Sequence, residues 1–124
     1  MEIILLDSNI LIDILKGRSE TISRVQSFEL PLMISSITVM ELMIGARNKQ
    51  EIALLEKFMG LFEVIHITPN ISSLAIQLVT KYAKSHTLDI ADGLIAATAL
   101  ANRAQLFTHN RKDFQFIPKL DLIT

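Results

Sequence analysis

The sequence contains no cysteine, only four glycines and three prolines in 124 residues, and no long apolar run. The absence of cysteine excludes disulfides and thiolate metal sites. The scarcity of glycine and proline predicts regular elements joined by short loops, and no apolar run reaches the roughly 18 residues of a membrane span. The first nine residues, MEIILLDSN, lack the basic start and long apolar stretch of a signal peptide. We therefore expect a cytoplasmic chain without membrane association.

An excess of charge of either sign is also missing, because 12 basic residues stand against 13 acidic ones and the formal net charge is −1. Bulk charge therefore gives no sign of a nucleic-acid-binding protein. If four of the acids surround metal ions, the remaining surface has a modest excess of basic residues, which permits RNA binding. Hydrophobic residues make up 50% of the chain, enough for a substantial core. The length fits one domain that spans residues 1–124.

Strand patterns alternate with helical patterns along the chain. The expected strands are residues 2–6, 31–35, 63–67 and 105–108, with a short fifth strand at 120–123. The expected helices are residues 10–15, 20–28, 38–46, 51–59, 71–82 and 89–102. This alternation predicts an α/β domain with a mostly parallel sheet of four to five strands. In such sheets ligands bind beyond the carboxyl ends of the strands, so the polar residues there are the first candidates for a site.

Two acids occupy such positions in the first third of the chain. Asp7 ends the first strand after four apolar residues, where a partly buried carboxylate needs a partner such as a divalent cation. The alternative is that Asp7 or Ser8 caps the following helix. Glu41 is the single acid of a helix that is apolar nearly all round, which indicates a polar stripe lining a cleft. The alternative there is a capping box formed by Thr38 and Glu41.

Further acids occur near the fourth strand. Asp89 and Asp92 are three residues apart, which places both carboxylates on one face of the Ala-rich helix. Alternatively, Asp89 is an N-cap and Asp92 only interacts with the helix dipole. Asn110 and Asp113 lie in the polar segment after the fourth strand, where a solvated turn is the ordinary interpretation.

The acids together form a less ordinary pattern than any one of them alone. They follow strands one, two and four, and one opens the helix that leads into strand four. If these strands are neighbours, the carboxylates converge at one end of the sheet and repel one another unless cations neutralise them. A set of oxygen ligands selects Mg²⁺ or Mn²⁺. Two such ions are the usual clamp for in-line attack on a phosphodiester.

Four segments, in order, resemble the sequence blocks of the PIN-domain family: LDSNILID at 6–13, ELMIGA at 41–46, DGLIAATA at 92–99 and LFTHN at 106–110. The resemblance covers essentially the whole chain, and the block at 92–99 is its most specific part. The small size and short loops are similar to those of VapC-type toxins of bacterial and archaeal toxin–antitoxin pairs. The resemblance implies a three-layer α/β/α fold around a parallel sheet and a Mg²⁺- or Mn²⁺-dependent endoribonuclease, a hydrolase of RNA.

The resemblance also implies roles for individual residues. Asp7, Glu41 and Asp92 would be the catalytic and metal-binding acids, and a metal-activated water would hydrolyse the RNA phosphodiester. Ser8 and Asn9 would support the first carboxylate, and Thr108 would be a polar neighbour after the fourth strand. Many PIN domains have an aspartate two residues after this threonine, whereas this chain has Asn110. Either Asn110 or Asp113 then completes the metal site, and we expect a weaker second site or a single ion.

The partners implied by the resemblance are an RNA substrate (tRNA, rRNA or mRNA), a cognate VapB-type antitoxin and a second copy of the chain in a homodimer. The three histidines are expected to be structural or exposed rather than catalytic, so EDTA should abolish activity. Candidate phosphate contacts are Arg18, Arg47, Lys49, Arg111 and Lys112, although solvated surface is the favoured interpretation of each.

Two other functions remain open at this point. One is a catalytically weak PIN-like module that binds RNA, which Asn110 favours. The other is a different Mg²⁺-dependent phosphodiesterase or nuclease on an α/β fold. An aspartyl phosphatase is disfavoured because Asp7-Ser8-Asn9 is not Asp-x-Asp, and the scattered glycines exclude a Gly-rich nucleotide loop.

Overall fold

Residues 2–124, which the computed structural model describes, form five strands, six α-helices and one 3₁₀ helix. The strands are β1 (Ile4–Leu6), β2 (Leu32–Ser35), β3 (Glu63–Ile65), β4 (Gln105–Phe107) and β5 (Asp121–Leu122). The helices are α1 (Ser8–Leu15), α2 (Ser19–Gln26), α3 (Ser36–Ile44), α4 (Lys49–Met59), α5 (Pro69–His86), α6 (Ile90–Ala101) and the 3₁₀ helix η1 (Arg111–Asp113). Every element expected from the sequence is present, although the strands are shorter than expected and His66 lies just after β3.

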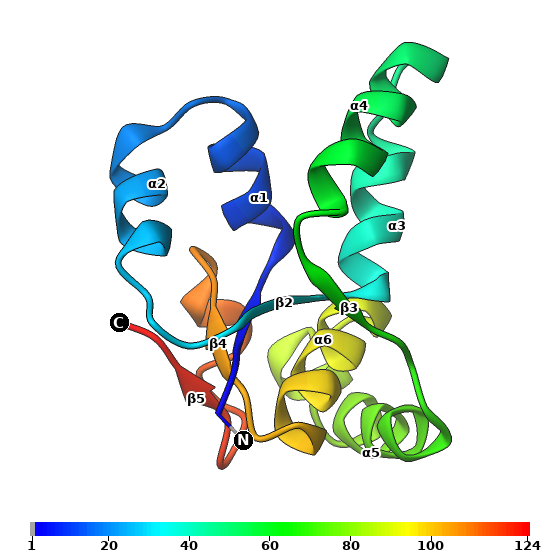
Figure 1. Cartoon of the computed structure of the whole chain (residues 1–124). Coiled ribbons are helices and arrows are strands. Elements are labelled where there is room, and N and C mark those ends of the chain that lie inside the picture. The colour runs from blue at the N-terminus through cyan, green and yellow to red at the C-terminus, as the bar shows by residue number, and fades with distance from the viewer. Residues whose placement is uncertain (1) are drawn as a thin grey trace.

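The sheet has the strand order β3-β2-β1-β4-β5, and every neighbouring pair is parallel. The chain first adds strands on one side of β1 and then crosses to add β4 and β5 on the other side (Figure 1). The reversal of strand order between β1 and β4 is the place where open α/β sheets bind ligands. Leu6 lies opposite Phe107 in the register, so the residues that follow them, Asp7 and Thr108, emerge side by side.

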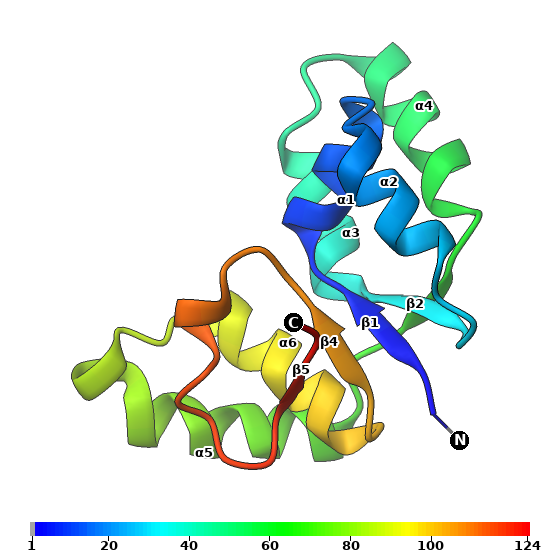
Figure 2. The same ribbon diagram turned by 90° about the vertical axis from the view of Figure 1, so that its left-hand side faces the viewer.

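Alternate residues of β1 face opposite layers, as the two-residue period of a strand requires. Ile3 and Leu5 pack with α5 and α6, whereas Ile4 and Leu6 pack with the apolar faces of α1 to α4. Figure 2 shows these two groups of helices on opposite sides of the sheet. The result is the α/β/α arrangement that the sequence predicted.

Helix ends follow local sequence signals. Gly17 adopts a positive φ of 73° directly after α1, a conformation that glycine reaches without the steric cost of a side chain, and it ends the helix where the sequence indicated a stop. No helix within residues 2–124 has the length and apolar character needed to cross a membrane.

Candidate active site

Asp7 lies at the carboxyl end of the central strand and is only 4% exposed. Thr108 Oγ1 donates a hydrogen bond to Asp7 Oδ2 over 2.8 Å, and Asn9 Nδ2 donates to the same oxygen over 3.3 Å. The main-chain N–H of Ser8 donates to Oδ1 over 2.9 Å. Burial raises the pKa of Asp7, and these three hydrogen bonds oppose the rise. Asp7 is the N-cap of α1, yet its burial exceeds what a cap needs.

Glu41 points toward the same edge of the sheet from α3. The N-cap of α3 is Ser35, whose hydroxyl accepts from the main-chain N–H of Ile37 over 3.1 Å. Thr38 is therefore inside the helix, and the capping-box alternative is wrong. Glu41 Oε1 instead accepts a hydrogen bond from Ser8 Oγ over 3.3 Å, so the Ser8 hydroxyl supports Glu41, and only the Ser8 backbone supports Asp7.

The pKa of Glu41 is raised, first by partial loss of hydration around its carboxyl group and then by the charge of Asp7. The residue as a whole is exposed, so this loss concerns only the carboxyl end, which lies against the protein. One helical turn earlier on the same helix, Thr38 is 1% exposed, and its Oγ1 has no hydrogen-bond partner within residues 2–124. Buried hydroxyls are ordinarily satisfied, so this edge of α3 is suited to a further polar ligand.

Asp92 opens α6, and its environment is the most perturbed of the acids. Asp89 is the N-cap of α6 and accepts from the main-chain N–H of Asp92 over 2.8 Å, as the alternative interpretation of Asp89 held. Burial, followed by the charges of Asp89, Asp7, Asp113 and Glu41, raises the pKa of Asp92 to about 7. Carboxylates from four separate segments of the chain therefore act on this single group.

Asn110 and Asp113 are the two candidates for the fourth position of the metal site, and they contribute in different ways. The main-chain N–H of Asn110 donates to Thr108 Oγ1 over 3.0 Å, which orients the hydroxyl that binds Asp7. Asp113 in η1 contributes negative charge, which raises the pKa of both Asp7 and Asp92. Asn110 thus acts through its backbone, while Asp113 acts through its charge.

The donors at this edge fit a hard divalent cation. Within the described residues 2–124, no three His, Asp or Glu side chains are already drawn together as a set of metal ligands. The charges of these acids nevertheless act on one another: Asp113 raises the pKa of Asp7 and Asp92, and Asp7 raises that of Glu41. Groups of this kind repel until a cation neutralises them, and their oxygen atoms are the ligands that Mg²⁺ and Mn²⁺ prefer.

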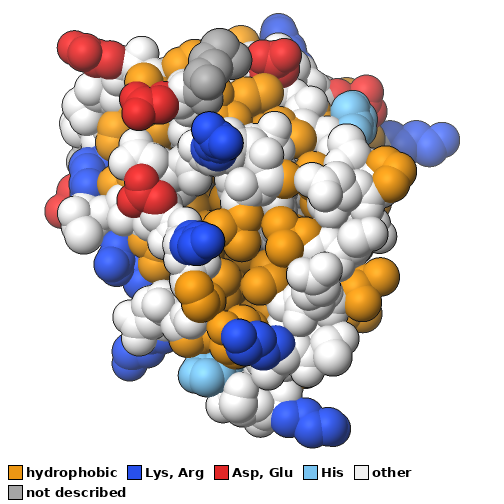
Figure 3. All heavy atoms as spheres, turned by 90° about the horizontal axis from the view of Figure 1, so that it is seen from below, with side chains coloured by type: hydrophobic (Ala, Val, Ile, Leu, Met, Phe, Trp, Pro, Cys, Tyr) orange, Lys and Arg blue, Asp and Glu red, His pale blue; other side chains and the backbone are white. Residues whose placement is uncertain are grey.

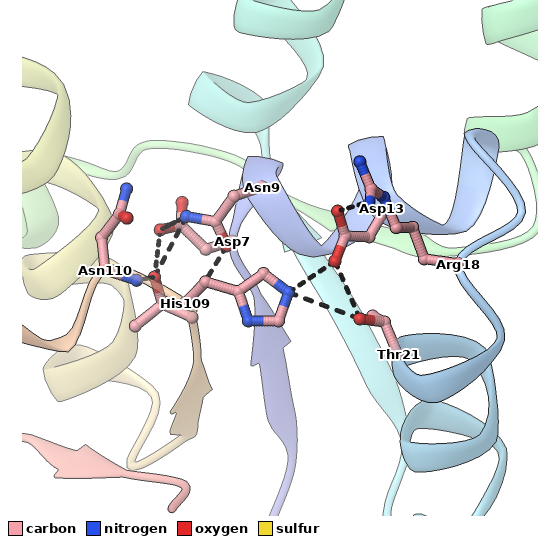
Figure 4. Close-up of polar contacts among 8 residues, drawn as sticks. Asp7, Asn9, Asp13, Arg18, Thr21, His109 and Asn110 are labelled. Carbon is pink, nitrogen blue, oxygen red and sulfur yellow. Dashed lines mark hydrogen bonds and ion pairs between the residues drawn. The ribbon is translucent and has the colours of Figure 1, made fainter.

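A second polar cluster adjoins the acids and was not found in the sequence (Figure 4). Asp13 Oδ2 lies 2.8 Å from both Thr21 Oγ1 and His109 Nε2, and Arg18 Nε lies 3.9 Å from Asp13 Oδ1. The hydrogen bond from Thr21, followed by the hydrogen bond and charge of His109, lowers the pKa of Asp13. The only local signal is the spacing of Asn9 and Asp13, four residues apart on α1, which places both on one helical face.

The chain matches the family model for the PIN domain over residues 4–120. It is 34% identical over 122 residues to ribonuclease VapC19 of Mycobacterium tuberculosis, and the match covers 94% of this chain and 95% of the relative. The chain belongs to the PIN-domain family. Membership in its VapC group, predicted from the small size and short loops, is thereby confirmed.

Solved structures of toxin–antitoxin proteins have the same fold. One is a toxin–antitoxin complex from Klebsiella pneumoniae, which is 33% identical with a TM-score of 0.81 and covers 97% of this chain and 95% of that one. Another is VapBC2 from Rickettsia felis bound to a promoter DNA fragment, which is 30% identical with a TM-score of 0.83 and covers 99% and 98%. These similarities confirm the predicted fold over nearly the whole chain.

Proposed function

We propose that this VapC-type ribonuclease is a Mg²⁺- or Mn²⁺-dependent endoribonuclease and the toxin of a VapBC-type pair, with residues 1–124 as its nuclease domain. The observation that carries the proposal is the grouping of Asp7, Glu41 and Asp92 at one edge of the sheet, where each has a raised pKa. Family membership supports RNA as the substrate. Because the proposed substrate is cellular RNA, the protein would act in the cytoplasm.

Asp7, Glu41 and Asp92 would hold the cation, with Asp113 or Asn110 at the fourth position. When bound, such a cation lowers the pKa of water and stabilises negative charge on phosphate oxygens. The chain's own contribution is orientation. Thr108 and Asn9 hold one oxygen of Asp7, and the Ser8 backbone holds the other. Both carboxylate oxygens are thus fixed, which limits the loss of side-chain freedom on binding substrate and metal.

The raised pKa of Asp92 links cation binding to the release of a proton. With a pKa of about 7, Asp92 is protonated in part of the molecules and charged in the rest at neutral pH. Cation binding requires the charged form, so uptake of Mg²⁺ or Mn²⁺ should release a proton from this residue. Cleavage should therefore increase with pH as Asp92 loses its proton.

The test is cleavage of RNA by the chain purified without any partner. We expect cleavage of tRNA, rRNA or mRNA with Mg²⁺ or Mn²⁺ and none with EDTA. Asp7→Asn and Asp92→Asn should each reduce the rate by at least about a hundred-fold, because a metal site loses affinity when its ligands or their supports change. Asp121→Asn, a change to an exposed acid on β5, is the matched control and should keep full activity.

Two results would contradict the proposal. Cleavage that persists in EDTA or in both site variants would mean that other residues perform the reaction. RNA binding without cleavage by the folded, metal-supplied protein would instead favour the catalytically weak RNA-binding module.

The cognate antitoxin is the partner that we propose, since the structural relatives include toxin–antitoxin complexes. A hollow of about 570 Å³ opens beside Glu41 between α1, α3 and α4. Exposed apolar side chains line it, including Leu15 and Leu54, together with Arg47 and Glu51. This surface leads directly to the acidic site, so a segment bound there can place a cationic side chain among the carboxylates. We also propose a homodimer, for which surface apolar residues such as Ile44 are available.

A further inference from the structure

A second hollow, of about 560 Å³, lies beside the acids at the end of β4. Three arginines from separate segments line it: Arg18, Arg24 and Arg111. Thr108 and His109 also line it, and both contact the residues that surround Asp7. We call this surface the arginine hollow. It places cations next to a site that is otherwise acidic.

Two of the arginines are held in place by contacts that use only part of each guanidinium. Arg24 lies 5.3 Å from the ring centroid of Phe107 and 6.0 Å from that of Phe28, and it donates to the main-chain carbonyl of Thr124. Arg111 Nη1 donates to the main-chain carbonyl of Ile123 over 2.8 Å. Because a guanidinium has five N–H donors, both groups keep donors for a ligand in the hollow.

The acids of the hollow do not cancel these cations. Asp13 already accepts hydrogen bonds from Thr21 and His109 and faces Arg18. Its carboxylate is thus surrounded by donors and acts as a positioning residue for Arg18 and His109. Glu20 is exposed at the first turn of α2. The three arginines face two acids, Asp13 and Glu20, so the positive charges in the hollow exceed the negative ones by one.

The hollow and the acidic site are joined through β4. Thr108 Oγ1 donates to Asp7, and the main-chain N–H of His109 donates to Asn9 Oδ1 over 3.1 Å. The acidic site and the hollow therefore adjoin, so an RNA strand with its scissile phosphate at Asp7 can extend over the end of β4 into the hollow. Guanidinium groups bind phosphate oxygens in pairs of parallel hydrogen bonds.

We propose that the arginine hollow binds an RNA backbone phosphate next to the scissile one. The proposal rests on the proposed ribonuclease function, since it takes the acidic site as the place of cleavage. It assigns a function to Arg18 and Arg111, which the sequence left as either phosphate contacts or solvated surface. It adds Arg24, which no sequence pattern indicated.

The first experiment measures binding without cleavage. The Asp92→Asn protein in EDTA is titrated with a short fluorescent single-stranded RNA of mixed sequence at several salt concentrations. Arg18→Glu is compared with Lys81→Glu, which makes the same charge change on α5, outside both sites. Arg18 is 64% exposed, so its replacement should not impair folding. Arg18→Gln and Lys81→Gln repeat the comparison without charge reversal.

Arg18→Glu should weaken RNA binding about ten-fold or more and reduce the slope of log K against log salt by about 0.7, the value for one lost contact to a single strand. Lys81→Glu should change affinity less than about two-fold, because it removes no local contact. In cleavage assays, Arg18→Gln should raise KM while kcat stays nearly constant, as expected when binding is lost equally from ground and transition states.

The outcomes separate this proposal from the proposed function. Absence of cleavage by the natural chain would contradict the function, while the binding comparison would still decide whether the hollow takes RNA. Equal effects of Arg18→Glu and Lys81→Glu, or an unchanged salt slope, would overturn the phosphate site. If Arg18→Glu weakens binding of the antitoxin but leaves RNA binding intact, the hollow is a protein contact and the proposal is also overturned.

Discussion

The three acids of the proposed site differ in what surrounds each carboxylate. Asp7 is buried and hydrogen-bonded, Glu41 shares one hydrogen bond with Ser8, and Asp92 sits in the first turn of a helix. The dipole at a helix start favours a negative charge, so position alone would lower the pKa of Asp92. Its pKa is nevertheless raised to about 7 by burial and neighbouring acids. Burial, followed by repulsion among the carboxylates, therefore outweighs the helix dipole at this residue.

The raised pKa of Asp92 predicts how the stability of the metal-free protein depends on pH. Asp92 has a pKa near 3.8 when unfolded and about 7 when folded, so the folded state holds more protons between these values. Stability must then fall as pH rises from about 4 to about 7. Asp92→Asn removes this loss, and its melting temperature in EDTA should exceed that of the natural chain above pH 7 but match it near pH 4.

The measurement is a series of thermal melts across this pH range with and without Mn²⁺. Asp121→Asn serves as the control and should follow the natural chain at every pH. Mn²⁺ should stabilise the natural chain more at high pH, where it no longer competes with a proton on Asp92. Parallel pH profiles for Asp92→Asn and the natural chain would show that Asp92 is not perturbed by its neighbours.

At the scale of elements, the sequence determines which segments form strands and helices more clearly than how they pair. The apolar run before Asp7 and the stripe on α5 predict their elements directly. Strand order depends on pairing between distant segments, and the pairing of β4 with β1 has no local signal. The acids could converge only if β2, β1 and β4 were neighbours, and the structure shows that they are. The start of α3 was misplaced because Ser35, Ser36 and Thr38 are all plausible caps, and only the structure selects Ser35.

Helices α5 and α6 pack so closely at Gly93 that a larger residue there should destabilise the fold. A Cβ atom added at Gly93 would lie 2.6 Å from Val79 Cγ2, a contact that a stiff branched side chain cannot easily relieve. Gly93→Ala should therefore lower the free energy of unfolding by about 1–3 kcal/mol, as overpacking does in cores. Urea titration monitored by circular dichroism measures this change.

Gly45→Ala is the matched control for this variant. A Cβ atom there would lie 3.5 Å from its nearest neighbour, which is ordinary contact, and Gly45 has a φ of −75°. Its stability should stay equal to or above that of the natural chain. A Gly93→Ala protein as stable as the natural one would show that the two helices can separate at no cost. Since Asp92 precedes Gly93, such a separation would also shift the acid.

At the scale of the whole molecule, charged residues form local groups despite the net charge of −1. The acids lie at the carboxyl edge of the sheet. At its other end, Figure 3 shows apolar side chains with lysines and arginines around them, and a hollow of about 680 Å³ there is lined by Lys81, Arg103 and Lys119 among others. Net charge averages over these regions, which is why composition gave no sign of a binding function.

The cluster around Asp13 was not predicted because it depends on contacts between distant segments of the chain. Asp7, Glu41 and Asp92 were predicted because Asp7 ends a strand, Glu41 is the single acid of an apolar helix, and Asp92 lies in the first turn of a helix. The contact between Asp13 and His109 joins residues 96 positions apart, and no periodicity connects them. Contacts of this length arise only once the sheet is assembled, so the arginine hollow required the fold.

The proposed antitoxin surface predicts that the exposed side chain of Leu54 contributes to antitoxin binding. Leu54 is 68% exposed and lines the hollow beside Glu41. Leu54→Asp should weaken binding of the proposed cognate antitoxin by about ten-fold or more, the loss expected when a charge replaces a central apolar contact. RNA cleavage by the isolated variant should stay unchanged, since Leu54 is not one of the residues proposed to hold the cation. Calorimetric titration and the cleavage assay measure the two quantities on the same protein.

Ile76→Asp is the control, because Ile76 is 64% exposed but lies on α5, in the opposite layer. Its antitoxin affinity should match that of the natural chain. Equal losses in both variants would indicate a general effect of surface charge, and a loss of self-association in Leu54→Asp with antitoxin binding intact would assign the surface to the homodimer. A loss confined to Leu54→Asp, with cleavage preserved, would mean that inhibition and catalysis use adjoining but separate surfaces. The antitoxin could then block the acids by its position while leaving the fold of the enzyme unchanged.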